Sequence, residues 1–222
     1  MKTILRGLLI ASLLGAGAIS AIIGRSESQQ HSLVFAMQVA SGAQKLYEAG
    51  QYEIARKALE EQLEATPDSL IVQRELAMQL AATGQVEAAV QHLEKVLDLD
   101  SDDAAAAAVL GRMLLKLGDI SEAERWQRRA VELQPENGMH HLALARTLLK
   151  QQHPEEALTS ARNAVRLAPG VAEAHILLAL ASRSVEDEPA ARAALEDALA
   201  IDPDNVEASN ALAEGFDLQP ND

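Results

Sequence analysis

Residues 104–137 read AAAAAVLGRMLLKLGDISEAERWQRRAVELQPEN, and they contain two helical stretches joined at a glycine and closed by a proline. The apolar residues of each stretch recur at helical spacing: Leu110, Leu114 and Leu117 in the first, and Ala123, Ala130 and Val131 in the second. Gly118, between the stretches, can adopt the positive φ that ends many helices. Pro135 cannot continue the second helix. The segment therefore predicts a helix–turn–helix unit with about fourteen residues in each helix.

The same unit recurs along the chain with a period of 34 residues. One small residue of the second helix is present in all five copies: Ala55, Ala89, Ala123, Ala157 and Ala191. A small residue of the first helix recurs in the same way: Ala43, Ala77, Gly111, Ala145 and Ala179. The turn position is occupied by Gly50, Gly84 and Gly118, and then by Gln152 and Glu186. A fixed period of this length indicates helical repeats that stack on their neighbours.

This pattern resembles the tetratricopeptide repeat family, most clearly in the Leu110–Gly111 pair, Gly118 and Pro135. The resemblance implies an all-α protein, a right-handed α-solenoid of five helix-turn-helix repeats. We place the repeats at residues 36–69, 70–103, 104–137, 138–171 and 172–205. Residues 206–222 would then form a capping helix and a tail, because an array must cover its last apolar face. The sequence departs from the family where a tryptophan is frequent, with Val39, Gln73, Ala107, His141 and His175 in that place.

The N-terminus carries the pattern of an export or anchoring segment. Lys2 and Arg6 precede an uncharged run, residues 7–24, which is 18 residues long. Cations before an apolar run keep the N-terminus in the cytoplasm and direct the downstream chain across the membrane. We expect residues 1–24 to form a hydrophobic helix that anchors the protein in the inner membrane, with the repeats on the periplasmic side. A cleaved signal peptide, which would give a secreted or periplasmic protein, is the alternative, and residues 25–35 are expected to be a polar linker.

The composition of the chain excludes several classes of function. A formal net charge of −14 argues against nucleic-acid binding, which needs clustered cations. The chain has no cysteine, and this excludes disulfides, thiolate metal sites and a cysteine nucleophile. No phosphate-binding glycine loop, nucleophile elbow or zinc-protease motif is present in the sequence. We therefore expect a protein that is not an enzyme and has no cofactor.

Two groups of residues invite a metal-binding interpretation. Asp98, Asp100 and Asp102 alternate like the start of a calcium loop, but Asp103 stands where that loop needs glycine. His140 and His141 are adjacent, so on a helix they point about 100° apart and do not converge on one ion. We interpret the aspartates as residues of a turn between repeats. We interpret His141 and His175, which occupy matching places, as packing residues at the edge of the core.

A repeated cationic pair is the candidate binding site. The segments GRMLLK, residues 111–116, and ARTLLK, residues 145–150, lie 34 residues apart, and each has an arginine four places before a lysine. In tetratricopeptide arrays the first helices line a concave face, which implies a cationic stripe with apolar patches. The stripe would consist of Arg74, Arg112, Leu115, Lys116, Arg146, Leu149, Lys150 and Arg183. The alternative is that these cations are solvated, or paired with acids such as Glu173.

The resemblance implies a scaffold that binds a protein or peptide in a concave groove, with an acidic or C-terminal segment as a fitting ligand. The family's clamp for a C-terminal carboxylate is not matched, because no asparagine recurs in its place. We expect no small-molecule substrate. Analogy suggests an assembly factor for an envelope complex. The alternatives are an accessory subunit of an enzyme complex, such as the cytochrome c maturation machinery, and a self-associating structural adaptor.

Overall fold

The computed structural model describes residues 26–213, and within this range the chain is helical without any strand. It divides into two compact units, residues 1–83 and residues 84–222. The N-terminal unit contains α3 (Glu27–Glu48), α4 (Tyr52–Ala65) and α5 (Leu70–Ala82). The C-terminal unit contains α6 (Val86–Leu99), α7 (Ala104–Leu117), α8 (Ile120–Leu133), α9 (Gly138–Lys150), α10 (Pro154–Leu167), α11 (Ala172–Ser184), α12 (Glu188–Ile201) and α13 (Val206–Ala213). The all-α prediction is confirmed for the described residues.

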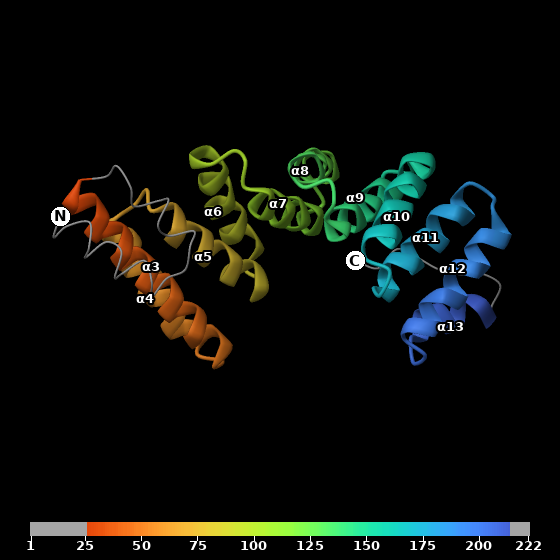
Figure 1. Ribbon diagram of the computed structural model, residues 1–222, viewed down its shortest axis with the longest axis horizontal. Coiled ribbons are helices and arrows are strands. Elements are labelled where there is room, and N and C mark those ends of the chain that lie inside the picture. The colour runs from red at the N-terminus through yellow and green to blue at the C-terminus, as the bar shows by residue number, and fades with distance from the viewer. Residues whose placement is uncertain (1–25, 214–222) are drawn as a thin grey trace, which may run out of the picture. The chain divides into compact units, whose positions relative to one another are not determined.

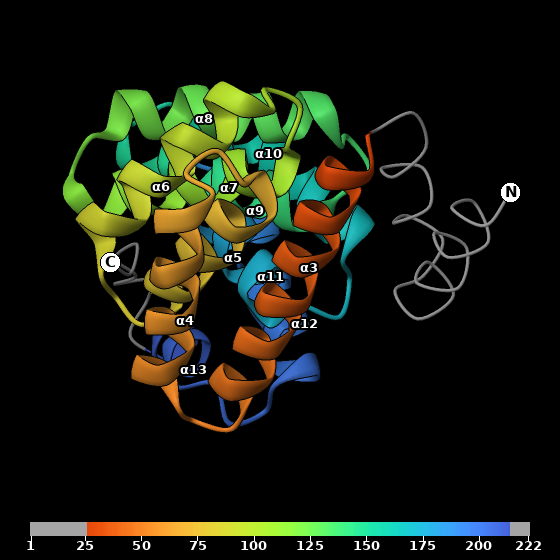
Figure 2. The same ribbon diagram turned by 90° about the vertical axis from the view of Figure 1, so that its left-hand side faces the viewer.

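In the N-terminal unit, α3 and α4 run side by side as a helical hairpin, and both pack against α5 (Figures 1 and 2). Helix α3 begins earlier than the sequence analysis predicted. The expected linker, residues 25–35, is helical from Glu27 onward, because Ser26 and Gln29 form a capping box. The predicted membrane helix, residues 1–24, lies outside the described residues. No helix within residues 26–213 is both long enough and apolar enough to cross a bilayer.

In the C-terminal unit, the helices pair as hairpins, α7 with α8, α9 with α10 and α11 with α12 (Figure 1). Helix α9 also packs against α7 and against α11. Packing between α8, α10 and α12 is sparser than packing between α7, α9 and α11. Stacked hairpins curve toward the layer whose helices lie closest together. We therefore call α7, α9 and α11 the inner helices, and α8, α10 and α12 the outer helices.

The residue at the turn position has a positive φ in each of the five repeats. Gly50, Gly84 and Gly118 have φ values of 77°, 79° and 84°. Where the glycine is replaced, Gln152 and Glu186 adopt φ values of 60° and 63°. The left-handed conformation is strained for these two residues, so the packing of the hairpin, and not the local preference of the turn residue, dictates the turn.

Small residues hold the paired helices close together. The recurring alanines of the second helices, Ala55, Ala89, Ala123, Ala157 and Ala191, are all fully buried. Gly111 of α7 lies against α8, where an added Cβ would be 2.7 Å from Gln127 Cγ and 3.0 Å from the Ala123 carbonyl oxygen. This contact orients α7, because it fixes which side of the helix faces α8.

Candidate partner-binding surface

The inner helices of the C-terminal unit carry the opposite charge to the chain. Helices α7, α9 and α11 contain five cations and one acid, Glu173, which is a formal charge of +4 in a chain of −14. Helices α8, α10 and α12 contain six arginines and eight acids, a formal charge of −2. The cations of the inner helices are Arg112, Lys116, Arg146, Lys150 and Arg183. Cationic charge is therefore concentrated on the layer that the sequence analysis selected as the binding face.

On α7 the buried residues and the basic residues lie on different sides of the helix. Leu110, Gly111 and Leu114 are buried against neighbouring helices. Arg112 and Lys116 are exposed and lie one turn apart, and Leu115 beside them is half-buried. Successive residues of a helix point about 100° apart, so the contact of Gly111 with α8 turns Arg112 away from that helix.

The matching pair on α9 has a different environment. Arg146 is half-buried and forms a salt bridge with Glu173 of α11. Burial lowers the pKa of the Arg146 guanidinium, nearby Arg112 lowers this pKa as well, and Glu207 of α13 raises it. Neither Arg112 nor Lys116 forms a salt bridge with any residue in the range 26–213, whereas all three arginines of α8 do. The two pairs look alike in sequence, but only the pair on α7 offers cationic charge without a salt-bridged acid.

The remaining residues of the predicted stripe lie in two separate units. Leu149 and Lys150 are half-buried on α9, and Arg183 is half-buried in the last turn of α11. Arg74 lies on α5, which belongs to the N-terminal unit, and it is half-buried there. The C-terminal unit thus contains seven of the eight predicted residues. We call these seven, Arg112, Leu115, Lys116, Arg146, Leu149, Lys150 and Arg183, the basic surface.

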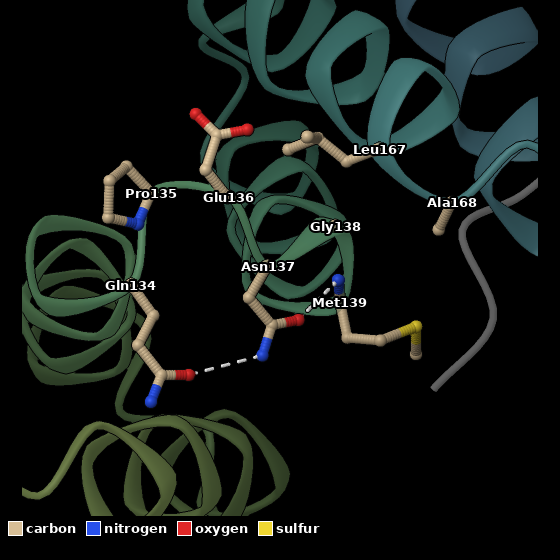
Figure 3. Close-up of a pocket in the computed structure, with 8 residues that line it drawn as sticks. All are labelled: Gln134, Pro135, Glu136, Asn137, Gly138, Met139, Leu167 and Ala168. Atoms are coloured by element: carbon tan, nitrogen blue, oxygen red, sulfur yellow. Dashed lines mark hydrogen bonds between the residues drawn. The ribbon is translucent and has the colours of Figure 1, made fainter.

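A pocket that the sequence analysis missed lies at the turn between α8 and α9. It has a volume of about 590 Å³ and is lined by Gln134, Pro135, Glu136, Asn137, Gly138, Met139, Leu167 and Ala168 (Figure 3). Asn137 caps α9 by accepting a hydrogen bond from the Met139 amide at 3.0 Å, and its amide donates to Gln134 Oε1 at 3.3 Å (Figure 3). The Asn137–Gly138 pair, two residues after Pro135, is the sequence signal that marked this turn.

Gly138 allows the end of α10 to form one wall of this pocket. A Cβ on Gly138 would lie 2.9 Å from Ala168 Cβ and 3.1 Å from Leu167 Cβ. Contacts below 3.0 Å do not occur without a shift of one partner, so any larger residue would push α10 away from α9. Met139, the next residue, is 50% exposed and forms an apolar side of the pocket.

Two buried histidines connect α9 and α11 to the proline that precedes each of these helices. His141 Nε2 lies 2.8 Å from the Pro135 carbonyl oxygen, and His175 Nε2 lies 3.0 Å from that of Pro169. Gln73 Nε2 donates to the Pro67 carbonyl oxygen at 2.8 Å in the same way. The interpretation of His141 and His175 as packing residues is confirmed. His140 Nε2 contacts Gln134 and Asn137, and burial lowers the pKa of His140, with a further decrease caused by His141.

The acidic segment 98–103 acts as a turn and a cap. Asp103 accepts a hydrogen bond from the Ala106 amide and so caps α7, and Asp100 accepts one from the Asp102 amide. Asp102 also forms a salt bridge with Arg129 of α8. Within residues 26–213, no three histidine or acidic side chains are grouped so that they could hold a metal ion.

Comparison with known proteins identifies the repeat. One model of the tetratricopeptide repeat matches residues 80–147, and a second matches residues 42–104 and 142–206, which together make up more than half of the chain. Among solved structures, the chain is similar to YrrB, described as "a TPR protein with an unusual peptide-binding site", with 22% identity, coverage of 78% of this chain and 89% of YrrB, and a TM-score of 0.68. It is also similar to MamA from Desulfovibrio magneticus RS-1 (residues 41 to the end), with 20% identity, coverage of 77% of this chain and 97% of MamA, and a TM-score of 0.69. No curated protein matches the sequence.

Proposed function

Because this chain belongs to the tetratricopeptide repeat family, we propose that it is a non-catalytic scaffold that binds a partner polypeptide on the inner helices of its C-terminal unit. The observation that carries this proposal is the charge of +4 on α7, α9 and α11 in a chain of −14. A partner segment with acidic side chains would complement that charge and would bind fastest at low ionic strength. Leu115 and Leu149, half-buried beside the cations, supply apolar contact area.

The arrangement of the salt bridges supports the same choice of surface. The arginines of α8 are already paired with acids of this chain, including Glu122, Glu124 and Asp102. An external acid would have to compete with those pairs. On α7, Arg112 and Lys116 are exposed without a salt bridge to residues 26–213, so an external acid meets no such competitor. Charge-assisted hydrogen bonds to arginine favour carboxylates as ligands.

A crosslinking pull-down with charge-reversed chains tests the proposal. The test variant replaces Arg112, Lys116, Arg146 and Lys150 by Glu. The matched control replaces four outer-helix arginines, Arg125, Arg129, Arg162 and Arg166, by Glu and therefore changes the net charge by the same amount. We expect the test variant to lose its partners and the control to keep them. Circular dichroism and thermal melts check that both variants are folded at the temperature of the pull-down, since each loses salt bridges of its own. Equal recovery of partners by the two variants would show that the inner helices are not the binding surface.

We also propose that residues 1–24 anchor the protein in the inner membrane, with the repeats on the periplasmic side and a role in assembling envelope complexes. The support is the cationic start, Lys2 and Arg6, before an uncharged run of 18 residues. Alkaline extraction of membranes tests the anchor, since an integral protein stays in the pellet and a protein released after cleavage appears in the supernatant. Release of a shortened chain would favour the signal peptide instead.

A further inference from the structure

The pocket at the α8–α9 turn and the basic surface share one face of α9. Met139, which lines the pocket, and Arg146, which belongs to the basic surface, are seven residues apart and hence on the same side of the helix. Seven residues advance an α-helix by about 10 Å. A ligand lying along α9 therefore meets an apolar pocket at one end and a guanidinium about 10 Å further on.

The pocket suits a large apolar side chain. Met139, Leu167 and Ala168 form apolar walls, and Gly138 contributes no side chain of its own (Figure 3). Asn137 at its rim is already engaged, because it caps α9 and donates to Gln134, and the Glu136 carboxylate lies 4.0 Å from Arg166 Nη1. A ligand that enters the pocket gains mainly by removing apolar surface from water, including that of Met139, which is 50% exposed.

At the other end of this face of α9, two guanidinium groups favour an anionic ligand. Arg112 and Arg146 occupy matching places of successive repeats, and their helices, α7 and α9, pack against each other. The positive charge of Arg112 adds to burial in lowering the pKa of Arg146. Glu173 is the acid of α11 that forms a salt bridge with Arg146, and Arg112 has no salt-bridged acid within residues 26–213. A ligand carboxylate between the two guanidinium groups would reduce their repulsion and accept hydrogen bonds from both.

We propose that the pocket and the Arg112–Arg146 pair form one two-point site for a segment in the polyproline II conformation. A large apolar residue of the segment enters the pocket, and an acidic residue three positions away binds between Arg112 and Arg146. In polyproline II, residues three apart lie on the same side and about 9 Å from each other, which matches the spacing along α9. The proposal rests on the proposed function and adds to it the chemistry and spacing of the partner.

Binding of labelled peptides to the full 222-residue chain, kept in neutral detergent, tests the spacing. The probe is a fluorescein-labelled peptide that carries Leu-Pro-Pro-Glu between Gly-Ser ends. Three control peptides replace the Leu by Ser, replace the Glu by Gln, or remove one proline so that the spacing is two. Fluorescence anisotropy at low ionic strength should show that the probe binds at least about tenfold more tightly than each control, as expected when a buried apolar or charged contact is lost. Equal affinity for the probe and the shortened peptide would overturn the proposal.

Two variants of the chain test the individual contacts. Met139→Ser should weaken the peptides that contain Leu and leave the Ser peptide unchanged. Arg112→Gln should weaken the peptides that contain Glu and leave the Gln peptide unchanged, and Arg125→Gln on α8 serves as the control because it removes an exposed arginine from an outer helix. If Met139→Ser weakens all four peptides equally, the pocket is not the apolar subsite. If the peptides show no preference while the charge-reversed chain still loses its partners in the pull-down, the two-point site is refuted and the scaffold function stands.

Discussion

Gly111→Ala is expected to destabilise the C-terminal unit, although alanine favours helices. Propensity alone would stabilise α7 by about 1 kcal/mol. The new Cβ, however, would lie 2.7 Å from Gln127 Cγ, 3.0 Å from the Ala123 carbonyl oxygen and 3.3 Å from the Gln127 amide nitrogen. Ala123 is fully buried and Gln127 is 1% exposed, so neither can move without repacking. Overpacking of this kind costs about 1–3 kcal/mol, so after the gain in propensity we expect a net loss of up to about 2 kcal/mol in the free energy of unfolding.

Two further substitutions isolate the cause of this loss. Gly42→Ala, in the interior of α3, should stabilise the N-terminal unit by about 0.5–1 kcal/mol, because no atom lies within 4 Å of its added Cβ. Gln127→Ala should make Gly111→Ala neutral or stabilising. The next repeat supports this expectation, since Ala145 and Ala161 occupy the same two places and are both fully buried.

Urea denaturation measures these effects. Far-UV circular dichroism follows both units, and the fluorescence of Trp126, the single tryptophan, follows α8 next to the altered contact. The Gly111–Gln127 coupling energy should be at least about 1 kcal/mol, as expected for residues in contact. If Gly111→Ala stabilises the protein as much as Gly42→Ala does, the close approach of α7 and α8 is not a constraint on this position, and our account of the orientation of Arg112 is wrong.

Gln152→Gly should raise the free energy of unfolding by about 1 kcal/mol, because Gln152 has a φ of 60° that glycine adopts without strain; unchanged urea midpoints would contradict this. Glu173→Gln removes the acid paired with Arg146, so it should lower stability by less than about 1 kcal/mol and strengthen binding of the acidic probe peptide in the anisotropy assay. Weaker binding of the probe would instead make Glu173 a supporting residue of the site. Burial lowers the pKa of His140 below about 6.5, so the unfolded chain takes up a proton first and stability falls as the pH drops below that value. When the pH is lowered from 7.5 to 5.5, the melting temperature of the His140→Gln variant should fall less than that of the unaltered chain. An equal fall would show that protonation of His140 is not the cause of the pH dependence.

The period of the sequence predicted the local structure well. The turn glycines, the buried alanines and the packing role of His141 and His175 all follow from residues that recur every 34 positions. Such features depend on contacts within one repeat or with its neighbour, so the 34-residue pattern of the sequence is sufficient to predict them. The start of α3 was the local feature that the pattern missed, because the capping box of Ser26 and Gln29 lies outside the repeat.

The sequence was ambiguous where two repeats have the same residues and different neighbours. Arg112 and Arg146 occupy the same place in their repeats, and nothing in the repeat distinguishes them. In the folded chain Arg146 is half-buried and meets Glu173 of the following repeat, whereas Arg112 is exposed. The pocket beside Met139 likewise depends on how closely the end of α10 approaches Gly138.

The amino-acid sequence was sufficient for the repeat, its turns and the face of each helix that carries charge, because these depend on spacing along one chain segment. The tertiary structure was needed to show which of those charges is paired with an acid and where a pocket opens, because both depend on residues about thirty positions apart that only packing brings together.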